Sequence, residues 1–203
     1  MKNKEIINKY FLPNMQEKLF LYDQYFKFFS KLYKNNLLPN KILLTGQSGL
    51  GKSTFAYHFI NSILSDKEDY SYDFTNFTIN PLNRSFRLIS QQCHPNFYLI
   101  DNFVDKLTIG INQIKNMINY VNKTSYEKKI KFILIDNVEY LNLHSVNALL
   151  KIIEELTSNT YIFFIHNSSI KLAETLKSRC IEFKIFFSNQ KKTSNIRKFI
   201  SIQ

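Results

Sequence analysis

The stretch GQSGLGKST, residues 46–54, constrains the fold of this chain more than any other part of the sequence. Its first eight residues match the pattern GxxxxGK[ST], which forms a phosphate-binding loop where a strand runs into a helix. The flanking residues supply that context, because KILLTG (41–46) is typical of a short buried strand and STFAYHFINSILS (53–65) of a helix with one apolar face. The sequence therefore predicts a nucleotide site at this junction.

Each residue type in the loop has a physical role. Glycines let the backbone curl so that successive N–H groups face an anion, and the following helix adds the positive end of its dipole. Lys52 can reach the β and γ phosphates, and the hydroxyl of Ser53 can ligate Mg²⁺. The predicted cofactors are therefore ATP and Mg²⁺. The predicted nucleotide-binding residues are Gly46, Gly49, Gly51, Lys52, Ser53 and Thr54.

The motif ILIDNVE, residues 133–139, is the second candidate for nucleotide chemistry. Asp136 ends an apolar run, where a carboxylate can hold Mg²⁺ together with Ser53. Asn137 stands where hydrolysing enzymes of this type usually carry Glu. An amide can orient water but cannot accept its proton, and general-base help contributes about 10²–10⁴-fold. Glu139 lies two residues further and is not expected to face the γ-phosphate, so slow or absent hydrolysis is expected.

Apolar runs alternate with helical stretches along most of the chain, which predicts an α/β fold with a parallel sheet. The expected strands are residues 41–46, 96–101, 131–137, 160–165 and 181–187. The expected helices are residues 19–36, residues 53–65, a stretch through Ile111, Ile114, Ile118 and Val121, and a stretch through Val146, Leu149, Leu150 and Ile153. Residues 66–84 are expected to form an irregular surface connection. A single domain over residues 1–187, followed by a polar tail at 188–203, is predicted.

Composition narrows the class of protein. The net charge of +11 fits a nucleic-acid partner, but an AT-rich genome that favours Lys, Asn and Ile explains it equally well, and both interpretations stay open. The sequence has no run of about 18 apolar residues, so no membrane-spanning helix is predicted. The charged start MKNKE does not resemble a signal peptide. Cys93 and Cys180 lie far apart, outside any CxxC pair, which argues against disulfides or structural zinc. A cytoplasmic location is expected.

Three further segments carry a family resemblance. NALLKIIEEL (147–156), the strand TYIFFI and then LAETLKSRC (172–180) together resemble the clamp-loader branch of the AAA+ ATPases, in particular the bacterial DNA polymerase III delta-prime and gamma/tau subunits. QCHPNFYLID (92–101) and TIGINQIKNM (108–117) resemble further segments of delta-prime. The resemblance spans roughly residues 19–186. It implies a P-loop NTPase (AAA+) three-layer fold with a five-stranded parallel sheet in a single domain.

The resemblance also implies roles for residues outside the loop. Arg179 of the SRC segment corresponds to the family's arginine finger, which reaches the γ-phosphate of a neighbouring subunit. Asn167 corresponds to the polar residue that senses the γ-phosphate at the end of the fourth strand, and His166 is interpreted as a strand-end residue. Asn137 takes the position of the catalytic Glu. Cys180 is expected to pack beneath the finger.

The sequence also departs from the family pattern. The family's four-cysteine zinc module would lie between the loop helix and the second strand, where only Cys93 is present, so no zinc is expected. Leu156 replaces the usual Pro after the Glu pair. The helical lid and the collar domain would begin where residues 188–203 stand, and this tail is interpreted as the start of a shortened lid region.

Three functions compete at this point. Asn137 favours a delta-prime-like, non-motor clamp-loader subunit with weak hydrolysis of its own, and the intact loop favours an active ATPase motor of gamma/tau type. The implied partners are other clamp-loader subunits, a sliding clamp and primed DNA contacted through its backbone, with no membrane. A nucleoside kinase fits less well, because arginines are few and the SRC segment would have no role. The arginines are Arg84, Arg87, Arg179 and Arg197.

Overall fold

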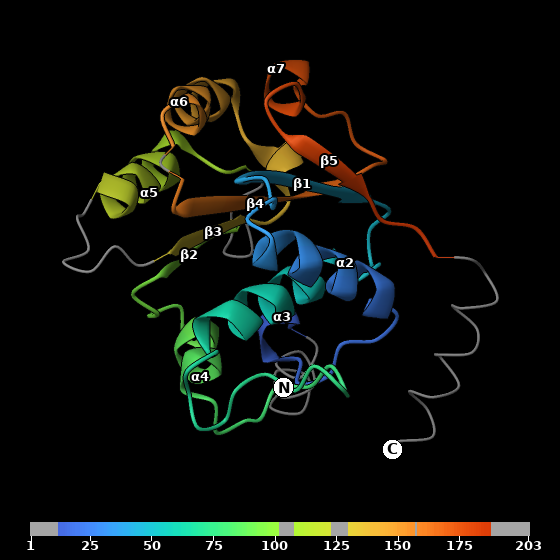
Figure 1. The fold of residues 1–203 in the computed structure, drawn as a ribbon. Helices are drawn as coiled ribbons and strands as arrows, with labels where there is room; N and C mark the ends of the chain where they lie inside the picture. Colours follow the sequence, from blue (N-terminus) through green and yellow to red (C-terminus); the bar gives the residue numbers. More distant parts are fainter. Residues whose placement is uncertain (1–11, 102–107, 123–129, 157, 188–203) are drawn as a thin grey trace, which may run out of the picture.

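A five-stranded parallel sheet forms the centre of the molecule in the computed structural model, which describes residues 12–101, 108–122, 130–156 and 158–187 (Figure 1). The spatial order is β2-β3-β4-β1-β5, and every neighbouring pair is parallel. The five-stranded parallel sheet predicted from the sequence is therefore confirmed. The strands are β1 (Lys41–Gly46), β2 (Phe97–Ile100), β3 (Lys131–Ile135), β4 (Thr160–Asn167) and β5 (Ile181–Lys184).

Helices cover both faces of the sheet, which gives three layers (Figure 1). One face carries α2 (Asp23–Lys34), α3 (Lys52–Leu64) and α4 (Arg84–Ser90), and the other carries α5 (Ile111–Asn122), α6 (Leu143–Glu154) and α7 (Glu174–Lys177). Two short 3-10 helices, η1 (Pro13–Met15) and η2 (Val138–Tyr140), complete the described elements. Since both faces are covered, all five residues of β3 are buried, and the four that follow Lys131 form one continuous apolar run.

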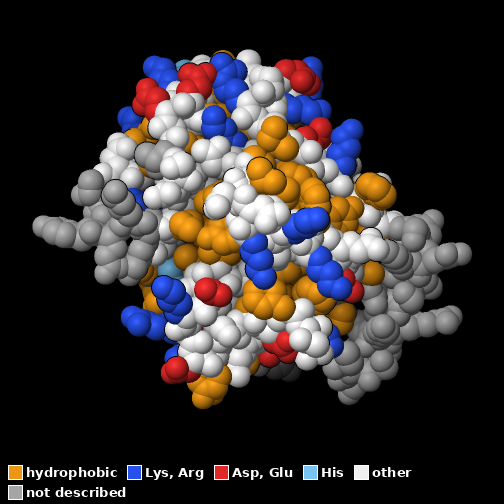
Figure 2. All heavy atoms as spheres, viewed as in Figure 1, with side chains coloured by type: hydrophobic (Ala, Val, Ile, Leu, Met, Phe, Trp, Pro, Cys, Tyr) orange, Lys and Arg blue, Asp and Glu red, His pale blue; other side chains and the backbone are white. Residues whose placement is uncertain are grey.

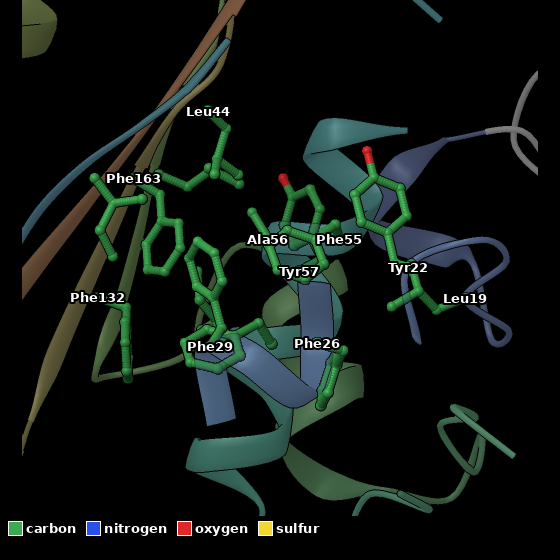
Figure 3. Close-up of a cluster of buried hydrophobic side chains, with 14 of the residues drawn as sticks. Leu19, Tyr22, Phe26, Phe29, Leu44, Phe55, Ala56, Tyr57, Phe132 and Phe163 are labelled. Carbon is green, nitrogen blue, oxygen red and sulfur yellow. The ribbon is translucent and has the colours of Figure 1, made fainter. Parts of the chain in front are cut away.

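The two faces of the sheet are packed with different side chains. The side packed by α2 and α3 is aromatic. Phe29 of α2 lies 5.1 Å from Phe55 and 4.7 Å from Phe183 between ring centroids. Figure 3 shows Phe29 and Phe55 in this cluster. The face under α5 and α6 is mainly aliphatic and includes Ile114, Leu149 and other side chains of this kind. Much of the chain's aromatic content therefore fixes α2 and α3 against the sheet, directly behind the loop between β1 and α3.

The structure adds one helix to the prediction and moves the start of another. Residues 66–83 form an irregular connection, as predicted, but α4 follows it where no element was predicted. The first turn of α4 is capped by Asn83, whose Oδ1 accepts a hydrogen bond from the N–H of Phe86 at 2.6 Å. A seven-residue helix is too short to show a periodic pattern, although the capping Asn was a local signal for its start. The first helix begins at Asp23 rather than residue 19, because Leu21 has a φ of 71°, which no right-handed helix allows.

Several predictions lie outside the described residues. These are the charged start at residues 1–11 and the tail at 188–203. The proposed domain boundary at residue 187 therefore stays a prediction. Within the described ranges, none of the helices is both long and apolar enough to cross a membrane.

His58 on α3 should make the stability of the fold depend on pH. Its imidazole is fully buried, with Nε2 donating to the carbonyl of Gln16 at 3.0 Å and Nδ1 accepting from the hydroxyl of Tyr72 at 3.1 Å. Burial lowers the pKa of His58 to about 4. Because the unfolded chain binds the proton more readily, stability should fall as the pH drops from about 6.5 to 4, by about 3 kcal/mol in all.

Urea unfolding between pH 7 and pH 4 checks this expectation. The variant His58→Gln should lose most of the pH-dependent part of the unfolding free energy, whatever its stability at pH 7. His144→Gln, which alters an exposed imidazole on α6, is the matched control and should keep the wild-type slope. An unchanged slope in His58→Gln would show that other groups cause the pH dependence.

Candidate nucleotide-binding site

The candidate site lies at the carboxyl edge of the sheet, where three neighbouring strands end. The loop follows β1, Asp136 follows β3, and Asn167 is the last residue of β4. Gly46 and Asn167 are register partners in the β1–β4 pair, so the loop starts beside the end of β4. Ligands in open parallel sheets bind at this edge. Sheet order therefore brings together residues that are up to 121 positions apart in the chain, counted from Gly46 to Asn167.

The three loop glycines are needed for two different reasons. Gly49 and Gly51 have φ values of 77° and 76°, a left-handed conformation that favours glycine. Gly46 is needed for space, because a Cβ there would lie 2.6 Å from the carbonyl oxygen of Ile185, just after β5. The hydroxyl of Tyr22 donates to the carbonyl of Leu50 at 2.9 Å and ties the loop to the aromatic core.

Lys52 reaches back over the loop from the first turn of α3. Its Nζ donates to the carbonyls of Gly46 and Gln47, both at 2.7 Å, and the residue is buried. Burial lowers the pKa of Lys52, and the charges of Glu139 and Asp136 act in the opposite direction. A partly desolvated ammonium at the centre of a loop of backbone N–H groups is suited to bind phosphate oxygens.

Ser53 and Asp136 meet from opposite sides of the site. The hydroxyl of Ser53 donates to Oδ2 of Asp136 at 2.8 Å, and the N–H of Asn137 donates to Oδ1 at 2.9 Å. Burial raises the pKa of Asp136, and these two hydrogen bonds lower it. A hydroxyl and a carboxylate this close are the oxygen ligands that Mg²⁺ takes beside a bound phosphate. Thr54, also predicted to contact nucleotide, lies on the same first turn of α3.

Glu139 is a residue of the site that the sequence did not assign to it. Asn137 is left-handed, with φ 56° and ψ 52°, and the chain turns there into η2. The carboxylate of Glu139 then lies against the end of β4, where the N–H of Asn167 donates to both of its oxygens at 3.3 Å. The sequence did not indicate this position of Glu139, because Glu139 stands two residues after the usual position of the catalytic Glu and no periodic pattern predicts a left-handed turn.

A hollow adjoins the loop on the side of β5. It has a volume of about 470 Å³, with Gly46, Gln47 and Leu50 on one side and Lys184, Phe186 and Phe187 on the other. Leu50, Phe186 and Phe187 give its walls apolar surface. A flat, largely apolar group joined to a phosphate chain therefore fits beside the loop.

Arg179 does not lie with the loop residues. It follows α7 and comes two residues before β5, whose first residue Ile181 is the register partner of Ile42 at the start of β1. The loop begins after Gly46, four residues or about 13 Å further along the strand. The guanidinium is half-exposed, with Nε donating to Oε1 of Glu154 at 2.6 Å and Nη1 to the carbonyl of Thr175 at 3.0 Å.

Cys180 and His166 both lie in packed parts of the structure. Cys180 packs against the aliphatic core, and burial raises the pKa of its thiol to about 12. His166 is buried at the end of β4, with Nε2 2.9 Å from the carbonyl oxygen of Ile170. The position of His166 at the end of its strand is as predicted, while the packing of Cys180 beneath Arg179 stays a prediction. The expected absence of zinc stays a prediction.

Comparison with known proteins gives a consistent set of relatives. The model of a family described as DNA polymerase III, delta subunit, matches residues 22–189. The DNA polymerase III subunit delta' of Pseudomonas aeruginosa is 25% identical over 140 residues, which cover 69% of this chain and 41% of that protein. The subunit delta' of Buchnera aphidicola subsp. Baizongia pistaciae is 27% identical over 166 residues, 76% of this chain and 48% of that protein. The chain thus spans less than half the length of these curated relatives.

A solved structure shares the fold. The DNA polymerase III, gamma subunit-related protein of Thermotoga maritima superposes with a TM-score of 0.53 at 16% identity, over 80% of this chain and 47% of that one. The three-layer fold with a five-stranded parallel sheet that was predicted from the sequence is therefore confirmed by the sheet itself and by this structural relative.

Gly46 provides a test of the loop geometry. The substitution Gly46→Ala places a methyl group against the backbone carbonyl of Ile185, so β5 or the loop must shift. We expect the free energy of unfolding to fall by about 1–3 kcal/mol. Gly110→Ala is the matched control, since a Cβ there meets nothing within 4 Å, and it should change stability by no more than about 0.5 kcal/mol. Equal stabilities of the two variants in urea unfolding would contradict the close approach.

Proposed function

Since this chain belongs to the family described as DNA polymerase III, delta subunit, we propose that it acts as a delta-prime-like subunit of a clamp loader. In this role it binds ATP in its loop and presents Arg179 to a neighbouring subunit while a sliding clamp is loaded onto DNA. The position of Arg179 at the amino edge of the sheet, away from the chain's own loop, carries the proposal. An arginine there serves a site on another molecule better than its own.

Nucleotide binding in this proposal uses the carboxyl edge. The backbone of residues 46–51 and Lys52 bind the phosphates, and the hollow beside β5 takes the base. Ser53 and Asp136 would hold Mg²⁺, which supplies charge neutralisation of the phosphates when bound. Slow hydrolysis is expected because Asn137 offers an amide where a carboxylate usually accepts the proton.

The contacts of Arg179 support its role as a finger acting in trans. Glu154 and the carbonyl of Thr175 hold Nε and Nη1, while Nη2 makes no hydrogen bond to the described residues. Guanidinium remains charged at all physiological pH values and presents its donors as a rigid fork. This fork can stabilise negative charge that develops on a neighbour's γ-phosphate during hydrolysis.

The proposed partners are other clamp-loader subunits, the sliding clamp and primed DNA, within a DNA polymerase holoenzyme. Lys and Arg side chains are spread among acidic and apolar ones on the face drawn in Figure 2. Contacts of this kind would bind backbone phosphates, fall with salt and show little sequence preference. An active motor of gamma/tau type is the second candidate, favoured by the complete loop, and fast turnover by this chain would support it.

The first test concerns nucleotide affinity. Lys52→Ala removes the ammonium that faces the phosphates, and we expect ATP affinity to fall about tenfold or more, measured by calorimetric titration in the presence of Mg²⁺. Lys171→Ala, an exposed lysine beyond β4, is the matched control and should bind as the wild type does. Equal affinities of both variants would argue against a nucleotide role for the loop.

The second test concerns the arginine finger. In the assembled complex, Arg179→Ala should slow ATP hydrolysis by the partner subunit at least about tenfold, because the transition state loses a positive charge. The ATP affinity of this chain itself should stay nearly unchanged. Arg87→Ala, which removes an exposed arginine on α4, should leave both quantities unaltered. Unaltered partner hydrolysis in Arg179→Ala would mean that this arginine does not act in trans.

A further inference from the structure

We propose that Glu139 accepts the proton of the attacking water when this chain hydrolyses ATP, in place of the residue at position 137. The inference rests on the proposed nucleotide binding and goes one step further, because it assigns the slow hydrolysis to a particular carboxylate. The turn after β3 places the carboxylate of Glu139 beside the end of β4, and this position is the basis of the inference.

The backbone explains why the carboxylate is displaced by two residues. The left-handed Asn137 reverses the chain directly after Asp136, and η2 closes with a hydrogen bond from the N–H of Tyr140 to the carbonyl of Asn137 at 3.0 Å. Val138 is buried in the aliphatic core and anchors this turn. Glu139 is only half-buried and extends from the anchored turn toward β4.

The position of the carboxylate relative to Lys52 follows from a short chain of contacts. Both oxygens of Glu139 lie 3.3 Å from the N–H of Asn167, the register partner of Gly46. The carbonyl of Gly46 accepts from Nζ of Lys52 at 2.7 Å and from the N–H of Ser168 at 3.1 Å. Asn167 therefore holds the carboxylate and Gly46 holds the ammonium, and these two residues are neighbours in the β1–β4 pair. Glu139 and Asp136 both act to raise the pKa of Lys52, and the charge of Glu139 has the larger effect.

This placement suits a proton acceptor. The two hydrogen bonds from one N–H are long and orient the carboxylate, while most of its lone pairs stay available for water. The water oxygen attacks the γ-phosphorus and its proton passes to Glu139. The bond from the γ-phosphorus to the bridging oxygen breaks, and ADP leaves with the electron pair. Glu139 returns the proton to solvent after inorganic phosphate has departed.

Other carboxylates at this edge suit the role less well. Asp136 is buried, and each of its two carboxylate oxygens already accepts a short hydrogen bond, one from the hydroxyl of Ser53 and one from the N–H of Asn137. Its oxygens are therefore engaged at the proposed cation site. Asp101 follows β2, three strands from β1 in the sheet and thus about 14 Å from the loop. Asn137 has an amide, which cannot take up a proton.

Single-turnover hydrolysis of γ-labelled ATP by the purified chain tests the proposal, with ATP binding measured on the same samples by calorimetric titration. Glu139→Gln keeps the shape and an acceptor oxygen for Asn167, so binding should change less than about threefold while hydrolysis falls about 10²-fold or more. Adding Asn137→Glu to Glu139→Gln should restore hydrolysis, since a carboxylate returns to the usual position. Glu155→Gln, an exposed residue at the end of α6, is the control and should match the wild type.

The outcomes separate this inference from the proposed function. If the wild type binds ATP but Glu139→Gln hydrolyses it equally fast, or if the wild type shows no turnover, Glu139 is not the acceptor while nucleotide binding stands. If Glu139→Gln loses binding and hydrolyses each bound ATP at the wild-type rate, the residue only positions Lys52 and the proposal is again wrong. If the wild type does not bind ATP, the proposed nucleotide function fails and this inference fails with it.

Discussion

The burial of β1 between β4 and β5 is the constraint on which the rest of the structure depends. It places the loop at the carboxyl edge, beside the end of β4 and next to the residues that follow β5, so a glycine at position 46 is required there. The same arrangement puts Arg179, which comes just before β5, at the amino edge. One strand order thus places the glycine-rich loop and an exposed arginine at two separate edges of the sheet.

The aromatic core supports the loop as well as the fold. Tyr22 stacks on Phe55 of α3 with 4.8 Å between ring centroids, and its hydroxyl holds the carbonyl of Leu50. Gly51, the N-cap of α3, has a left-handed conformation, and a Cβ at this position would lie 3.7 Å from the same ring. Packing behind the loop therefore fixes both the carbonyl at its tip and the start of the helix that carries Lys52 and Ser53.

Much of this fold was predictable because its strands are buried on both faces and its longer helices have one apolar face. Runs such as KFILI in β3 and the spacing of Val146, Leu149 and Ile153 in α6 are long enough to identify an element on local grounds. The start of α2, the short α4 and the direction of Glu139 were not predictable in this way. Leu21 and Asn137 adopt left-handed conformations that tertiary packing selects, and no periodic pattern encodes such a choice.

The two edges also explain why weak hydrolysis is compatible with the proposed role. A finger acting in trans needs a charged, well-held guanidinium at the amino edge, and Glu154 and Thr175 hold Arg179 without any contribution from the loop. In the proposed role the loop needs to bind nucleotide but does not need to hydrolyse it. An amide at position 137 is therefore compatible with that role, because the arginine acts without any hydrolysis at the chain's own loop. Selection on the arginine and selection on turnover would act on different edges of the same sheet.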